Sequence, residues 1–77
     1  RSIAVRPTSI AFAEELPMPA LLLSATEQEP ASLVVPPRTF NAGRMLRSMD
    51  TGRERKFRLT KLLQRGGDFE RVLFEES

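Results

Sequence analysis

Residues 44–59 (RMLRSMDTGRERKFRL) decide the fold class of this chain. Two arms, residues 44–49 and 53–59, flank Asp50-Thr51-Gly52, and a loop of this length with Gly at the positive-φ position is a common way to close a hairpin. In the second arm apolar and charged side chains alternate with the period of two that a half-buried strand shows. The stretch therefore predicts an antiparallel hairpin that pairs residues 44–49 with residues 53–59.

Proline and glycine divide the rest of the chain sharply. All six Pro lie in the first 37 residues and all four Gly lie after residue 42. Because Pro fixes φ and removes a backbone donor, the first half has room for short extended segments only. Residues 40–43 (FNAG) are typical of a turn, since Asn and Gly both tolerate positive φ. The strands expected outside the hairpin cover residues 2–6, 20–24, 32–35 and 68–76, and residues 8–16 are read as irregular or strand.

The segment after the hairpin has two interpretations. In the first, Thr60 is an N-cap, residues 61–65 (KLLQR) form one or two helical turns, and Gly66 is the positive-φ stop. In the second, one helix runs from residue 53 to residue 65, because this stretch holds good helix formers. Either way we expect a helical segment before Gly66.

Together these segments predict an all-β chain. We expect a small partly open barrel or sandwich of five to seven short strands with one short helical turn. A chain of 77 residues holds one modest core, so residues 1–77 are expected to be a single small β domain. The chain opens with Arg1 rather than Met, and we expect it to be a fragment of a larger protein.

Composition excludes several kinds of chemistry. The chain has no Cys, His, Trp or Tyr, so it lacks a thiol nucleophile, an imidazole base and the usual zinc ligands. We therefore expect no catalytic residue, no metal, no cofactor and no enzyme activity. The longest apolar run is far shorter than a spanning helix needs, which argues against a membrane protein. The absence of Cys is compatible with a cytoplasmic location, which we expect.

Positive charge is concentrated around the predicted hairpin. Residues 44–65 carry eight Lys and Arg side chains against Asp50 and Glu54. A field of this kind attracts phosphates or an acidic partner, although a solvated face is the simpler explanation. On residues 53–59 we expect Phe57 and Leu59 to face the core and Lys56 to face away. The candidate contact residues, for protein or phosphate, are Arg44, Arg47, Arg55, Lys56 and Arg58.

The expected partner is a protein or a neighbouring domain, and nucleic acid is the alternative. A nucleic-acid site needs exposed aromatic rings as well as charge, and the Phe residues are required for the core. A homodimer through an exposed strand edge is a further expectation, with Ser32–Val35 as the candidate edge.

Two stretches, Leu33–Arg44 (LVVPPRTFNAGR) and Phe57–Phe74 (FRLTKLLQRGGDFERVLF), carry a family resemblance over roughly the last 45 residues. They resemble the C-terminal β module of uncharacterised proteobacterial proteins associated with PilZ-like, cyclic-di-GMP-related regulation. The chain departs from a PilZ domain where the nucleotide binds. That family shows Arg-x-x-x-Arg followed by Asp/Asn-x-Ser-x-x-Gly, whereas Arg44 and Arg47 are closer together and Asn41-Ala42-Gly43 lacks the Ser. No residue is therefore assigned as a nucleotide ligand.

The resemblance and the composition lead to the same expectation. The chain is expected to be a non-enzymatic accessory or interaction module of a larger bacterial regulatory protein, with its contact surface on the basic hairpin. The alternative is a small β-barrel that binds nucleic acid.

Overall fold

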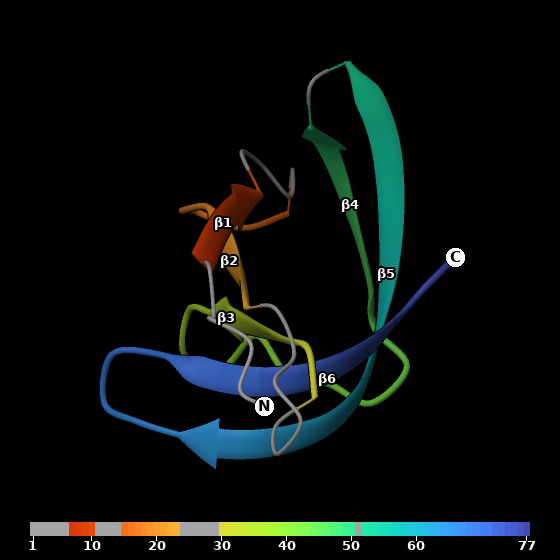
Figure 1. The fold of residues 1–77 in the computed structure, drawn as a ribbon. Helices are drawn as coiled ribbons and strands as arrows, with labels where there is room; N and C mark the ends of the chain where they lie inside the picture. Colours follow the sequence, from red (N-terminus) through yellow and green to blue (C-terminus); the bar gives the residue numbers. More distant parts are fainter. Residues whose placement is uncertain (1–6, 11–14, 24–29, 51) are drawn as a thin grey trace, which may run out of the picture.

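The computed structural model describes residues 7–10, 15–23, 30–50 and 52–77. The described residues form one antiparallel sheet of six strands in the order β1-β2-β3-β6-β5-β4 (Figure 1). The strands are β1 (Pro7–Ile10), β2 (Ala20–Leu23), β3 (Ser32–Val35), β4 (Met45–Asp50), β5 (Arg53–Arg65) and β6 (Glu70–Glu76).

The sheet is strongly curled along its longest strand, β5. The first half of β5 pairs with β4 and the second half pairs with β6, and β5 bends visibly between them (Figure 1). The edge strands β1 and β4 also approach each other. The predicted all-β class and the partly open barrel are confirmed.

The hairpin that the sequence predicts is present, but its ladder runs further than expected: Asp50, placed in the loop by the prediction, pairs with Arg53. Leu46 lies opposite Phe57, and Gly52 has a φ of 75° in the turn. The predicted turn before β4 is also present: the Arg44 N–H donates to the Asn41 carbonyl at 2.8 Å, and Gly43 has a φ of 86°. Both glycines have positive φ, a backbone conformation that costs free energy for residues with a Cβ atom.

The predicted helical segment is wrong in both of its versions. Residues 53–65 are one continuous strand, and the described residues contain no helix. Register shifts interrupt the β5–β6 ladder between Leu59 and Lys61 and again between Leu62 and Gln64. Such bulges insert an extra residue and increase the bend of a strand. Gly66 is also not at positive φ; its N–H donates to the Phe69 carbonyl at 2.9 Å and closes the β5–β6 turn.

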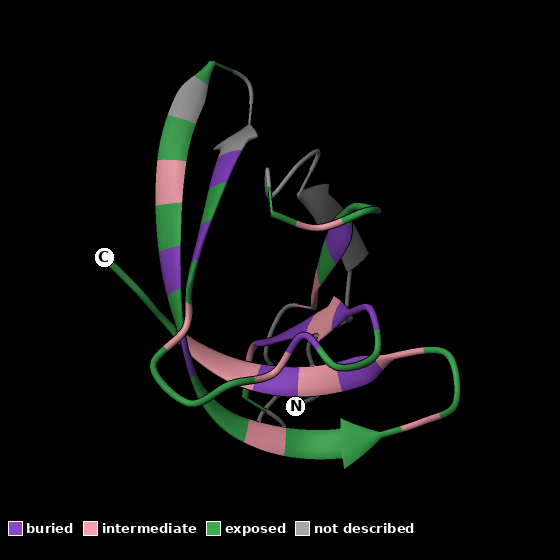
Figure 2. Ribbon diagram, turned by 180° about the vertical axis from the view of Figure 1, so that it is seen from behind, coloured by how far each residue is buried: buried purple, intermediate pink, exposed green. Residues whose placement is uncertain are grey.

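The core lies on the concave side of the curled sheet. The Phe57 ring meets the half-buried Phe74 ring edge-on, with centroids 5.2 Å apart and an interplanar angle of 88°. Burying one large apolar side chain stabilises a fold by roughly 1.5–3 kcal/mol, so each core residue makes a sizeable contribution. Buried and exposed residues alternate along the hairpin, as Figure 2 shows. The buried apolar residues are Ala20, Leu33, Val35, Leu46, Phe57, Leu59 and Val72.

The remaining strand predictions have different outcomes. Within the described residues, β2 and β3 confirm the strands expected at residues 20–24 and 32–35, and β6 confirms the strand expected at residues 68–76 from Glu70 onward. The strand expected at residues 2–6 lies outside them. Ser32–Val35 is not an edge, because β3 pairs with β2 on one side and β6 on the other. The choice of Ser32–Val35 as the dimer edge is therefore wrong, and a homodimer through another strand edge stays a prediction.

Candidate functional site

Three of the candidate cations gather on the outer side of the β4–β5 hairpin. Arg47 and Lys56 are opposite each other in the ladder, and Arg58 is opposite Met45. All three side chains are exposed, whereas their neighbours Phe57 and Leu59 are buried. The alternation that the sequence predicts for this strand is confirmed, and it collects Arg47, Lys56 and Arg58 into what we call the basic face.

Carboxylates reduce the charge of the basic face without cancelling it. Arg47 Nη1 lies 3.7 Å from a carboxylate oxygen of Glu54, and both side chains are about half exposed, at 49% and 47%. Exposed pairs of this kind contribute at most about 1 kcal/mol, so they yield easily to a better partner. Glu75 lies opposite Arg58 in the β5–β6 ladder and is also exposed.

The other two candidate cations point to the inner side and hold the fold together. Arg55 forms a bidentate ion pair with the Glu76 carboxylate. Its Nε donates to Oε2 and its Nη2 donates to Oε1, each at 2.9 Å. Its guanidinium also lies over the Phe57 ring, 5.1 Å from the centroid. Arg44 donates from Nη1 to the Thr39 carbonyl at 3.0 Å. The structure thus separates Arg44 and Arg55 from the basic face.

A buried carboxylate lies at the start of β6. Glu70 is 1% exposed and accepts hydrogen bonds from the Phe40 N–H at 2.8 Å and from Arg65 Nε at 2.9 Å. Burial acts to raise the pKa of this carboxyl. The bonds from the Phe40 N–H, the Arg65 guanidinium and the Arg38 N–H outweigh it and lower the pKa below its ordinary value. Glu70 is therefore a charged structural anchor rather than an acid or base.

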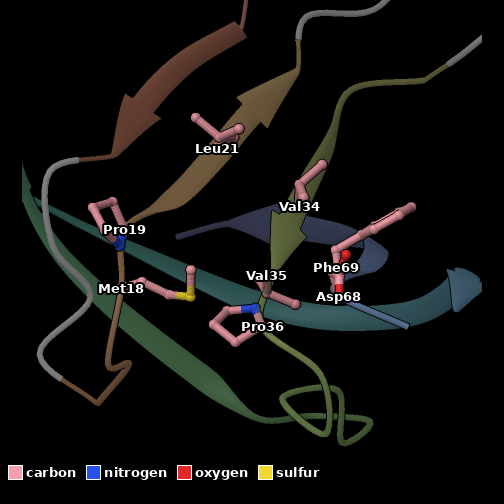
Figure 3. A pocket seen from close by; sticks show the side chains of 8 residues that line it. All are labelled: Met18, Pro19, Leu21, Val34, Val35, Pro36, Asp68 and Phe69. Atoms are coloured by element: carbon pink, nitrogen blue, oxygen red, sulfur yellow. The ribbon is translucent and has the colours of Figure 1, made fainter. Parts of the chain in front are cut away.

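A pocket of about 120 Å³ opens at the end of the sheet where β2 begins, β3 ends and β6 begins (Figure 3). The sequence predicts only strand ends and turns for these segments. The missed signal is the pair of prolines beside the strands, because proline walls present no backbone donor. The lining residues are Met18, Pro19, Leu21, Val34, Val35, Pro36, Asp68 and Phe69.

The described residues hold one buried carboxylate and no acidic cluster. No group of three or more acidic side chains is placed to hold a metal ion within this part of the chain. The buried carboxylate of Glu70 is already engaged on both oxygens. In the same residues there is no helix long and apolar enough to cross a membrane. What the arrangement provides is a charged face and an apolar pocket, which are means of binding.

Comparison with known proteins gives one match. Residues 3–77 match the family described as the FimW C-terminal beta-barrel domain. No similar curated protein and no similar solved structure was found. The match covers nearly the whole chain, and its β-barrel description agrees with the curled antiparallel sheet. The chain therefore belongs to the FimW C-terminal beta-barrel domain family.

Proposed function

We propose that this chain is a non-enzymatic, cytoplasmic interaction module of a larger bacterial regulatory protein. Its basic face contacts an acidic surface on a protein partner or on a neighbouring domain. The observation that carries the proposal is the position of Arg47, Lys56 and Arg58 on one exposed side of the hairpin. The family's description as a C-terminal domain supports the role of an accessory module.

Electrostatics explains why the partner should be acidic. Cations on one face raise the rate of encounter with an oppositely charged surface and exclude partners of like charge. The Arg47–Glu54 contact of 3.7 Å is exposed, so Glu54 competes only weakly with an incoming carboxylate. The proposal gives Arg44 and Arg55 a supporting role, because both are engaged within the fold.

The test is a binding measurement with an acidic probe. The probe is a labelled oligoglutamate peptide of about ten residues, titrated by fluorescence anisotropy at low salt, where screening is weak. We expect binding by the native chain and loss of binding in the triple variant Arg47→Glu, Lys56→Glu, Arg58→Glu. Equal binding by the native chain and this variant would contradict the proposal.

A matched control separates the basic face from charge in general. Thr60, Lys61 and Gln64 are exposed on β5 beyond the hairpin. Changing these three to Glu lowers the net charge by four units, against six units in the first variant, and leaves Arg47, Lys56 and Arg58 in place. The control variant should keep most of the oligoglutamate affinity. A loss as large as in the first variant would mean that net charge alone governs binding.

Nucleic acid is the second candidate, favoured by the same cations. A single-stranded DNA of about 20 nucleotides tests it, with affinity measured over a salt series. Three phosphate contacts predict a slope of log K against log salt of about −2. The described Phe40, Phe57, Phe69 and Phe74 are all buried or half-buried, which leaves this part of the chain with no exposed ring for stacking. We therefore expect the acidic peptide to bind at salt concentrations that release DNA.

The resemblance to modules of PilZ-like proteins adds one proposal about the parent protein. We infer that the larger protein takes part in cyclic-di-GMP-related regulation and that this domain lies beside the nucleotide site rather than forming it. Titration of the isolated chain with cyclic-di-GMP should leave its amide NMR spectrum unchanged. Saturable shifts would show instead that the domain itself binds the nucleotide.

A further inference from the structure

The pocket at the end of the sheet is a second binding feature, separate from the basic face. Its walls come from three segments: the start of β2, the end of β3 and the turn before β6 (Figure 3). Met18 is 54% exposed and Leu21 is 39% exposed, and both line the pocket. Exposed apolar side chains that gather around a hollow mark interaction sites more often than single exposed residues do.

The walls of the pocket are mostly apolar. Pro19 and Pro36 lack backbone N–H groups, so they leave no donor to be satisfied by solvent. Val34 and Leu21 add aliphatic surface, and Met18 adds a flexible thioether that adapts to the shape of an occupant. An apolar ligand gains from entering such a site because it displaces water that has few hydrogen-bonding partners there.

The volume of the pocket limits which chemical groups can occupy it. The pocket holds about 120 Å³, whereas an engineered apolar cavity of about 150 Å³ accommodates benzene. Sites for drug-sized small molecules are larger, at about 300–1,000 Å³. The pocket therefore fits one aromatic or large aliphatic side chain. The exposed Met18 and Leu21 beside it offer contacts to the chain that would carry this side chain.

The charge of Asp68 limits the choice of occupant further. Asp68 is exposed, and it is the one charged residue among those that line the pocket. A carboxylate beside an apolar pocket favours an occupant with a cation next to its apolar group and disfavours an anion. This preference is opposite to that of the basic face.

We propose that this pocket binds a segment of a partner polypeptide. The segment inserts one aromatic or large aliphatic side chain among Met18, Leu21 and Val34, and a Lys or Arg adjacent to that side chain pairs with Asp68. The proposal does not depend on the basic face, because the residues and the charge it requires are different.

The experiment uses the isotope-labelled chain and three capped hexapeptides followed by amide NMR. The sequences are Gly-Ser-Phe-Lys-Ser-Gly, the same with Glu in place of Lys, and the same with Ala in place of Phe. We expect the Phe-Lys peptide to shift the amides of the pocket segments with a Kd of about 1 mM. The Phe-Glu peptide should bind about two- to fivefold more weakly, the difference expected for one exposed ion pair. The Ala-Lys peptide should give no saturable shift.

Two variants locate the binding. In Asp68→Asn, the Phe-Lys and Phe-Glu peptides should bind with equal affinity. Both should still bind more tightly than the Ala-Lys peptide. Leu21→Arg should abolish binding by filling the pocket, and Leu63→Arg is its matched control, because Leu63 is equally exposed at 39% but does not line the pocket. Each variant is first checked for a native-like amide spectrum.

Specific results would overturn the proposal. They are equal shifts with the Ala-Lys peptide, equal loss in Leu21→Arg and Leu63→Arg, or no pocket shifts in the millimolar range. Pocket shifts that depend on protein concentration without any peptide would assign the pocket to a second copy of the chain instead. Failure of oligoglutamate binding at the basic face would leave all of these measurements unaffected.

Discussion

The carboxylate of Glu70 accepts a hydrogen bond of 2.8 Å from the backbone N–H of Phe40, thirty residues earlier in the chain. This contact fastens the loop after β3 to the start of β6. Arg38 in that loop has a φ of 63°, a conformation that is costly for a residue with a side chain. The charged acceptor in the interior stabilises the loop because it receives the Phe40 N–H, two residues after Arg38.

Removing this carboxylate should destabilise the domain. In Glu70→Ala, the Phe40 N–H and the Arg65 guanidinium lose a charged acceptor, and we expect the free energy of unfolding to fall by about 2–3 kcal/mol. Urea denaturation followed by circular dichroism measures the change. Glu75→Ala is the control, since Glu75 is exposed on the same strand and should change stability by no more than about 0.5 kcal/mol. Equal effects of the two substitutions would show that Glu70 is not an anchor.

Glu70 should also give stability a dependence on pH. Its folded-state pKa lies below the ordinary value of 4.5. The ionised form therefore contributes stability that is fully present above the unfolded-state pKa and is lost as pH falls through the lower folded-state pKa. Urea midpoints measured between about pH 7 and pH 3 should fall in the native chain. Glu70→Gln should lose this part of the decline; an unchanged decline would assign the acid sensitivity to other carboxylates.

The helical interpretation of residues 60–65 failed for a reason visible in the β5–β6 ladder. The inward-facing Phe74, Val72 and Glu70 lie opposite Leu59, Leu62 and Arg65. Each bulge adds one residue, so the inward positions of β5 follow at intervals of three instead of two. That spacing is what a helix shows, and nothing local in the sequence reveals a bulge. The hairpin was predictable because its second arm, residues 53–59, keeps the regular period of two and a Gly-containing turn precedes that arm.

A matched pair of substitutions on β5 tests the bulged strand directly. Leu59 is fully buried, whereas Leu63 is 39% exposed. We expect Leu59→Ala to lower the free energy of unfolding by about 2–5 kcal/mol, as truncation in a core does. Leu63→Ala should stay within about 1 kcal/mol of the native chain. Comparable losses at both positions would fit a helix with both side chains on its buried face and would contradict the strand.

The two adjacent glycines before β6 should respond differently to substitution. A Cβ on Gly66 would lie 2.6 Å from Cε1 of the Phe69 ring, whereas a Cβ on Gly67 would have no atom within 4 Å. Gly66→Ala must therefore displace the ring, which is part of the pocket wall. We expect altered amide shifts at the pocket in Gly66→Ala and a native-like spectrum in Gly67→Ala. Identical spectra would show that the ring does not rest on Gly66.

The basic face was predictable in part. Alternation along residues 53–59 identified Lys56 and Arg58 as outward-facing, and the register of the hairpin placed Arg47 beside them. Arg44 and Arg55 were grouped with them by charge alone. Glu76, the partner of Arg55, comes from a strand that no sequence pattern brings near, and the partner of Arg44 is a backbone carbonyl, that of Thr39. The pocket was missed for the same reason, because its walls meet only when β3 pairs with β6.

Chemical-shift mapping with the oligoglutamate peptide tests the central claim most directly. If the basic face is the contact surface, the largest amide and side-chain shifts fall at Arg47, Lys56 and Arg58, and they disappear at high salt. Arg44 and Arg55, which are engaged on the inner side, should move little. Shifts spread evenly over all exposed cations, or no shifts at low salt, would contradict the account.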